Sequence, residues 1–251
     1  MPRSPFRAIG AAPVLALALA LAAPAPALSA QDAPAPVVTK ITADLGYVAV
    51  SGNTQLTTLS IGEKLTQSRG RILLEQGVAF VYSQQADSVT TNFLRLYGRG
   101  DYKIDQVFAA FAGLAYDRNR FAGIEHRYEE ALGLTAKVLR TATDTVHLEG
   151  GGQFTQQLGT DGIQQNFPSA RGAASWRHRF SASAYFTQAV EYLPNLKETA
   201  DWRVNAESGV VAPISAKINL KLSYVIRYDN LPQPGFSEID RLFTTGLQIT
   251  F

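Results

Sequence analysis

The chain has 251 residues and carries 23 Lys and Arg against 21 Asp and Glu, which gives a formal net charge of +2. This charge is too small to indicate binding to nucleic acid. The chain has no cysteine, which excludes thiol catalysis, zinc sites built on thiolates and iron–sulfur clusters held by cysteine. The length suits one large all-β domain, and we expect no cofactor.

The first thirty residues have the features of an export signal. Arg3 and Arg7 precede an apolar run over residues 14–21, and small residues offer cleavage after Ala27 or after Ala30. An uncleaved anchor helix is the weaker alternative, because the run is shorter than the ~20 residues that a membrane span needs. We therefore predict a signal peptide over residues 1–30 and a Pro/Ala-rich leader over residues 31–38.

From residue 39 onward, apolar and polar residues alternate in segments separated by turn signals. Such alternation indicates β-strands with one apolar and one polar face. We predict about twelve strands, at residues 39–50, 55–67, 71–82, 89–102, 106–118, 126–139, 145–157, 166–180, 182–193 and 201–211, with two more in a final hairpin over residues 216–251.

The final hairpin shows the alternation most strictly. Every second residue from Ile218 to Tyr228 is apolar, and the pattern resumes at Phe243 and ends the chain. A last strand of this kind, ending on Phe, resembles the closing strand of bacterial outer-membrane barrels, which the insertion machinery reads. We expect the insertion signal to consist of Leu247, Ile249 and Phe251.

The lengths of the strands and connections favour a membrane barrel over a soluble sandwich. Membrane strands need about 9–11 residues, whereas globular strands average about five or six. Counted from the first strand, the odd connections are mostly longer and more polar than the even ones, as external loops are in outer-membrane barrels. Aromatic residues near the strand ends suit the two membrane interfaces: Tyr82, Tyr102, Tyr116, Tyr128, Phe180, Tyr192, Trp202 and Tyr228.

We therefore predict an antiparallel transmembrane β-barrel of about 12 strands over residues 39–251. We expect it in the cell outer membrane, with outer-membrane lipids and the barrel-insertion machinery as its partners. A periplasmic barrel or sandwich that carries lipid is the alternative outside the membrane. The sequence does not indicate an oligomeric state.

The polar face of the predicted strands carries charges of both signs. Barrels of eight strands are filled by side chains and those of sixteen or more enclose a channel, so twelve strands leave open a narrow pore or a plugged barrel. Arginines outnumber acids on this face, so a pore would prefer anionic or zwitterionic small solutes. The candidates for lining the lumen are Arg95, Arg99, Glu149, Arg171, Arg203, Glu207, Lys221 and Arg227.

Enzyme chemistry has weaker support from the sequence. A barrel-type lipid hydrolase or acyltransferase would need a Ser–His pair, and no serine lies in a hydrolase motif. The histidines, at positions 126, 147 and 178, lack metal-ligand spacing, and we expect His126 to lie at a loop edge near Asp117 and Glu125. The glycines at 150–152 lie inside a strand and no Lys-Ser/Thr follows them, so they form no phosphate loop. We predict no catalytic or metal-binding residue.

Two stretches resemble a known family. Residues 47–54 are similar to its opening Gly-Tyr…Ser-Gly-Asn-Thr motif, and residues 114–128 are similar to its central Tyr-x-x-x-x-Phe-x-Gly-x-x-x-Arg pattern. The family is that of the salt-induced outer-membrane proteins, domain of unknown function 481. The chain departs from the family at Gly133-Leu134, where the family has Gly-Tyr. The resemblance implies an outer-membrane barrel connected with salt or osmotic stress and no defined activity. We expect a narrow pore for small solutes, with a non-conducting structural or binding barrel as the alternative.

Overall fold

The computed structural model describes residues 36–50, 56–86 and 88–250, so the predicted signal peptide, most of the leader and Phe251 lie outside the described residues. In this part of the chain, no helix is long and apolar enough to span a membrane. This part also contains one 3-10 turn, η1 (Arg120–Ala122). The strands are β1 (Val38–Val50), β2 (Leu56–Arg69), β3 (Ile72–Gln85), β4 (Ser88–Lys103), β5 (Phe108–Asn119), β6 (Ile124–Arg140), β7 (Asp144–Gly159), β8 (Gln164–Arg179), β9 (Tyr185–Pro194), β10 (Trp202–Pro213), β11 (Ile218–Asp229) and β12 (Ile239–Thr250).

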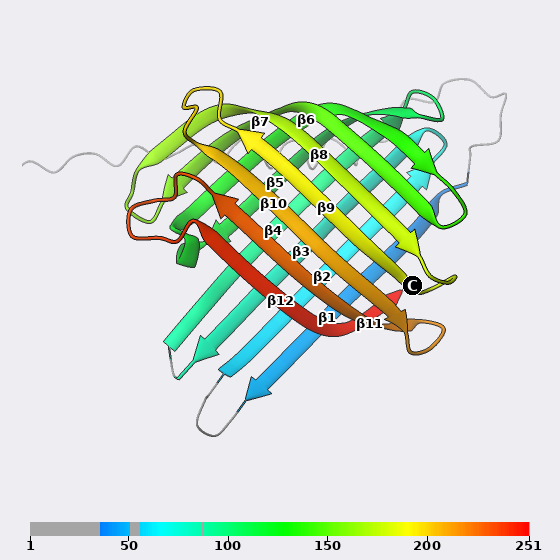
Figure 1. Cartoon of the computed structure of the whole chain (residues 1–251), viewed down its shortest axis with the longest axis horizontal. Helices are drawn as coiled ribbons and strands as arrows, with labels where there is room; N and C mark the ends of the chain where they lie inside the picture. Colours follow the sequence, from blue (N-terminus) through cyan, green and yellow to red (C-terminus); the bar gives the residue numbers. More distant parts are fainter. Residues whose placement is uncertain (1–35, 51–55, 87, 251) are drawn as a thin grey trace, which may run out of the picture. The chain divides into compact units, whose positions relative to one another are not determined.

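These twelve strands form a closed antiparallel barrel (Figure 1). Each strand pairs with its neighbours in sequence, and β1 pairs with β12, where Leu45 lies opposite Leu247. The strands contain from 10 residues in β9 to 17 in β6. Closure leaves no unpaired sheet edge, which is the condition that strands must meet to cross a membrane. The predicted all-β antiparallel barrel of twelve strands is therefore confirmed.

The two ends of the barrel differ in their connections. The turn end carries the connections at residues 70–71, 104–107, 141–143, 180–184 and 214–217, together with the first residues of β1 and the last of β12. The loop end carries the remaining connections, of which residues 195–201 and 230–238 are the longest described. The predicted gap between the third and fourth strands, from residue 83 to residue 88, is shorter in the structure, because β3 extends to Gln85 and β4 begins at Ser88.

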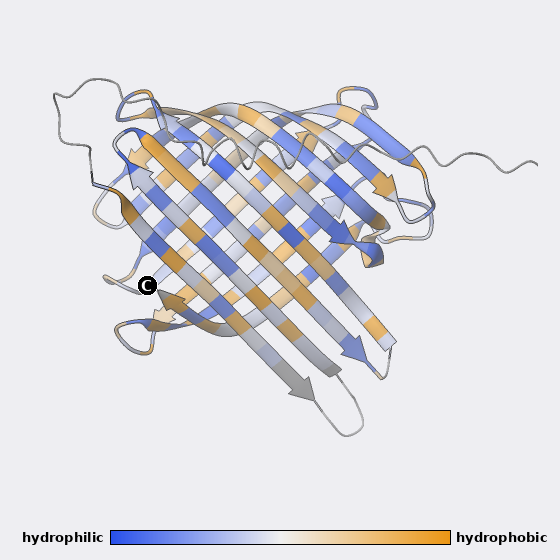
Figure 2. Ribbon diagram, turned by 180° about the vertical axis from the view of Figure 1, so that it is seen from behind, coloured by the Kyte–Doolittle hydropathy of each residue, from blue (hydrophilic) through white to orange (hydrophobic). Residues whose placement is uncertain are grey.

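Alternate residues of each strand point out of the barrel and into its lumen, and Figure 2 shows the resulting alternation of hydrophobic and hydrophilic residues along the strands. Leu220 and Leu247 lie on the outer face and are 40% and 44% exposed. Between them in sequence, Lys221 points inward and forms an ion pair with Asp44. A large apolar outer surface with charges enclosed inside is the arrangement of a membrane barrel, and a soluble sandwich would show the reverse.

Aromatic side chains gather on the outer face near both ends of the barrel. At the loop end, Trp202 stacks on Tyr228 with ring centroids 4.9 Å apart, and Tyr116 lies 5.2 Å from Tyr128. At the turn end, Trp176 contacts the edge of Phe186 at 5.5 Å. Rings at these two levels suit the two interfaces of a membrane.

The glycines at 150–152 lie inside β7, as the sequence indicates. A Cβ atom added at Gly151 would overlap the carbonyl oxygen of Leu132 on β6. Glycine therefore allows the backbones of β6 and β7 to approach closely at this point.

Candidate functional site

The lumen holds a cavity of about 960 Å³, lined by residues from strands around the whole barrel. Its lining includes all the lumen candidates from the sequence: Arg95, Arg99, Glu149, Arg171, Arg203, Glu207, Lys221 and Arg227. Its volume falls within the range of small-molecule pockets, about 300–1,000 Å³. The cavity is therefore the candidate site for a solute.

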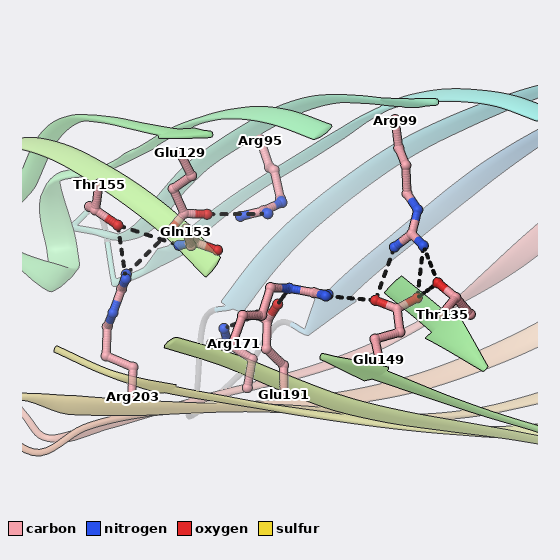
Figure 3. Close-up of polar contacts among 11 residues, drawn as sticks. Arg95, Arg99, Glu129, Thr135, Glu149, Gln153, Thr155, Arg171, Glu191 and Arg203 are labelled. Carbon is pink, nitrogen blue, oxygen red and sulfur yellow. Dashed lines mark hydrogen bonds and ion pairs between the residues drawn. The ribbon is translucent and has the colours of Figure 1, made fainter. Parts of the chain in front are cut away.

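Most of the arginines in the middle of the lumen already have carboxylate partners (Figure 3). Arg99 on β4 donates to Glu149 on β7 at 3.0 Å, and Arg171 on β8 donates to the same carboxylate at 2.6 Å. Arg171 also donates to Glu191 at 2.7 Å, and the Arg99 guanidinium lies 4.1 Å from the centre of the Phe111 ring. These charge-assisted bonds hold the guanidinium groups against one wall and neutralise them.

Nearer the loop end, side chains cross the bore from wall to wall. Arg203 on β10 donates to Glu129 on β6 at 3.2 Å, and these strands are four places apart in the ring. Glu129 also lies 3.5 Å from Arg95, which donates to Asp117 at 2.6 Å. We call the residues at this level the crossing layer: Phe93, Arg95, Asp117, Glu129, Arg203 and Arg227.

Arg227 completes the crossing layer from the other side of the ring. Its guanidinium lies 4.2 Å from the centre of the Phe93 ring, although β11 and β4 are five places apart. Such a contact between a cation and an aromatic face is favourable where water is excluded. The crossing layer thus narrows the bore with two arginines that span it.

Beside the crossing layer, packed side chains fill the lumen toward the loop end, and Thr155 and Leu193 lie opposite Glu129 and Arg203 in register. Thr155 is fully buried, Leu193 is 1% exposed, and Phe167 and Ser169 are buried beside them. These residues come from β7, β8 and β9, so three neighbouring strands fill the mouth from one wall. Solvent therefore meets a packed layer at this end of the lumen.

The loop over residues 230–238 adds a cover from the opposite wall. A Cβ atom added at Gly123 would lie 2.9 Å from the Phe236 ring, and one added at Gly159 would overlap the amide of Gln233. The loop joins β11 to β12, whereas these glycines lie next to β6 and at the end of β7, across the ring. The loop therefore crosses the mouth, and the two glycines make room for it.

The cavity extends instead to the turn end. Two of its lining residues there, Lys40 and Arg177, have exposed side chains. Tyr185 contributes to the same stretch of wall and donates to Gln248 at 3.2 Å, which narrows the bore without closing it. The lumen is thus a vestibule that opens at the turn end and is closed at the loop end.

The three histidines lie apart from one another. His126 lies on the outer face, where Nδ1 is 2.8 Å from the Tyr116 hydroxyl, and His178 pairs with Asp144 at 2.8 Å. His147 faces the lumen near the turn end, in register with Lys137. Among the described residues, no group of His, Asp and Glu could hold a metal ion.

The expected proximity of His126 to Asp117 is wrong, whereas Glu125 does lie near His126, at 3.8 Å. Asp117 points into the lumen toward Arg95, and His126 points outward. Residues 117 and 126 belong to paired strands but have opposite orientations, and the ladder between β5 and β6 is irregular at Asp117. Strand alternation therefore separates the two side chains.

Glu129 is the acidic residue of the crossing layer that sequence patterns did not single out. It lies beside Glu130, and only one of two consecutive strand residues can face the lumen. The structure turns Glu129 inward to Arg203, whereas Glu130 is exposed on the outer face. The sequence did contain one signal, because Glu129 and Arg127 are two residues apart and therefore lie on the same face of the strand. This spacing shows that they share a face, but whether that face is the lumen depends on the register of β6.

The chain is similar to several solved structures. An outer-membrane channel from Pseudomonas putida F1 is similar with a TM-score of 0.50 and 12% identity, covering 87% of this chain and 96% of that chain. The NanC porin has a TM-score of 0.48 and 10% identity, covering 84% of this chain and 97% of that one. The KdgM porin in complex with oligogalacturonate has a TM-score of 0.48 and 13% identity, covering 85% and 99%. At these identities the likeness concerns the fold alone.

No curated protein has a sequence that matches this chain. The family described as "Protein of unknown function, DUF481" does match, over residues 43–251. This match includes eleven of the described strands in full and most of β1. It confirms the resemblance seen in the motifs at residues 47–54 and 114–128. The chain therefore belongs to the DUF481 family of proteins of unknown function.

Proposed function

We propose that the protein is an outer-membrane barrel whose lumen admits small polar solutes. The observation that carries this proposal is the cavity of about 960 Å³, which is lined by charged side chains inside a closed barrel with an apolar outer face. An apolar outside matches lipid, and a charged inside holds water. The similar outer-membrane channel from Pseudomonas putida F1 supports the same class of protein.

The turn end faces the periplasm in this proposal. Outer-membrane barrels have short periplasmic turns and longer external loops. Here the longest described loops, at residues 195–201 and 230–238, are at the loop end. The first strand begins and the last strand ends at the turn end, as expected for a chain that is exported to the periplasm before it inserts.

The crossing layer sets the size of what passes. Arg203 and Arg227 reach across the bore, and the cover over residues 230–238 lies beyond them. Ions and small solutes pass when these side chains and the loop move aside, so the open conductance is small. Truncating Arg227, which is held by an aromatic contact and no carboxylate bond among the described residues, widens the bore with the least loss of ion pairing.

Planar-bilayer recording of the refolded protein tests the pore. We expect small, discrete conductance steps for the natural sequence and larger steps for Arg227→Ala. Arg241→Ala is the matched control, because Arg241 lies on the outer face one strand away, and its steps should equal those of the natural protein. Silence of both the natural protein and Arg227→Ala would refute the pore and leave a non-conducting structural or binding barrel.

We propose outer-membrane lipids and the insertion machinery as partners, on the basis of the apolar outer face and of the last strand with Leu247 and Ile249. A role in salt or osmotic stress has the family resemblance as its support. Growth of a deletion strain after a shift to high salt tests that role, and growth equal to the parent would contradict it.

A further inference from the structure

Positive charge is concentrated at the turn end and has no acidic partner there. Six exposed cations lie in the turns or at the strand ends, and none of them forms an ion pair within residues 36–50, 56–86 and 88–250. They come from five connections around the ring, so the charge is spread over the whole rim. The six are Arg69, Arg71, Lys103, Arg140, Arg179 and Lys217.

The acids of this end are already engaged. Asp105 accepts hydrogen bonds at 2.7 Å from the backbone N–H groups of Val107 and Phe108, which lower its pKa and keep it charged within its own turn. Asp144 accepts from Trp176 at 2.9 Å and pairs with His178 on the outer face. Neither carboxylate neutralises the rim.

Three further cations face the lumen just inside this rim: Lys40, Lys137 and Arg177. Arg177 lies 4.6 Å over the Tyr185 ring, and none of the three has an acidic partner in the described part of the chain. Deeper in the lumen the pattern changes, because Lys64 pairs with Glu75. The cations at the opening of the vestibule thus lack carboxylate partners, whereas within it Lys64, Arg95, Arg99, Arg171, Arg203 and Lys221 are paired with carboxylates.

The opposite end of the barrel is acidic in balance, although Arg118, Lys197 and Arg241 also lie there and Arg120 is paired with Glu125. Six acids lie at the loop end, at the ends of the strands or in the connections: Asp161, Glu198, Asp201, Asp229, Glu238 and Asp240. A barrel that is basic at its open end and acidic at its closed end has a field along its axis. Such a field attracts anions to the opening and raises their local concentration there.

We infer that the opening at the turn end is a binding site for anionic solutes that carry phosphate or carboxylate groups. Lys40, Lys137 and Arg177 bind the anion, and the six cations of the rim steer it to the opening. The inference rests on the proposed function in one respect, since the lumen must be accessible to solutes. It adds to that function the charge of the solute and the end from which it enters.

Calorimetric titration with inorganic tripolyphosphate tests the site on the full mature chain refolded in uncharged detergent. The variant Lys40→Gln/Lys137→Gln/Arg177→Gln should weaken binding by about tenfold or more, because it removes the three donors at the opening. The matched control Arg118→Gln/Lys197→Gln/Arg241→Gln removes the same charge at the loop end and should leave the affinity nearly unchanged. Circular dichroism establishes that both variants are folded.

Two results would overturn the site: no binding by the natural protein, or equal losses in the two triple variants. Repeating the titration in nanodiscs with anionic phospholipid separates a solute site from a lipid site, and loss of tripolyphosphate binding there would assign the cations to lipid headgroups and refute the inference. Conductance is a separate readout. Ion flow without tripolyphosphate binding keeps the pore and rejects this site, whereas binding without ion flow keeps the site and rejects the pore.

Discussion

The ion pair between Arg203 and Glu129 allows the crossing layer to be tested by stability. Both side chains are largely removed from solvent, with 6% and 9% exposure, and Arg203 also donates to Thr155 at 3.2 Å. Removing one partner of a buried pair costs about 3–5 kcal/mol, because it leaves an uncompensated charge. We therefore expect Arg203→Ala to lower the free energy of unfolding substantially.

The geometry places the loss near the lower end of that range. Glu129 keeps a second guanidinium, that of Arg95, at 3.5 Å, but Arg95 is already bound to Asp117 at 2.6 Å and compensates the charge only in part. A loss of about 3 kcal/mol changes the unfolding equilibrium by roughly a hundredfold. Adding Glu129→Gln to Arg203→Ala should recover part of this loss, since the double variant has no unpaired carboxylate at this place.

Urea unfolding in lipid vesicles, followed by tryptophan fluorescence, measures these changes, and Trp202 lies next to Arg203 as a local probe. Arg120→Ala is the matched control, because Arg120 donates to Glu125 at 2.5 Å but is 53% exposed. We expect a much smaller loss there, as exposed pairs are screened by solvent. Equal losses for Arg203→Ala and Arg120→Ala, or strictly additive effects in the double variant, would refute the buried crossing layer.

Three further predictions concern the cover, the outer face and assembly. Gly159→Ala should displace the long loop between β11 and β12, which would increase its cleavage by protease and the conductance, whereas Gly172→Ala, which has open space around it, should change neither. Leu132 is 69% exposed on the outer face, so Leu132→Arg should cost about 2–4 kcal/mol in vesicles if lipid surrounds it, and Ile163→Arg in a loop should cost little. Deleting Phe251 should reduce assembly in the outer membrane of cells without preventing refolding in detergent, and normal assembly would contradict its role in the insertion signal.

Sequence periodicity was sufficient to predict the strands and the face on which each side chain lies, because side-chain alternation is a local property of extended backbone. Leu220 and Lys221 are adjacent, and the pattern alone predicted that they lie on opposite faces. The same pattern placed the predicted lumen arginines on the polar face, and the structure has them lining the cavity. Glu130 keeps this alternation of faces but breaks the match between face and polarity, because it is a charged residue exposed on the outer face.

The connections were less predictable, because the point at which a strand ends depends on its partner. The sequence around residues 84–88 is polar and suggested a loop, yet Gln84 and Gln85 pair with residues of β2 and β4 and continue the sheet. Polar residues near the end of a strand contact water whether they belong to the strand or to a loop, so composition does not distinguish a strand end from a loop.

Sequence alone thus determined the number of strands, their alternation and the family, each of which depends on residues that are close in the chain. The tertiary structure decided which charges meet. Arg203 forms an ion pair with Glu129, which is 74 residues away in the sequence. The loop that carries Gln233 contacts Gly159 on the other side of the ring. These contacts depend on the closure and register of the ring, because residues distant in sequence become neighbours across a lumen only after all twelve strands have paired.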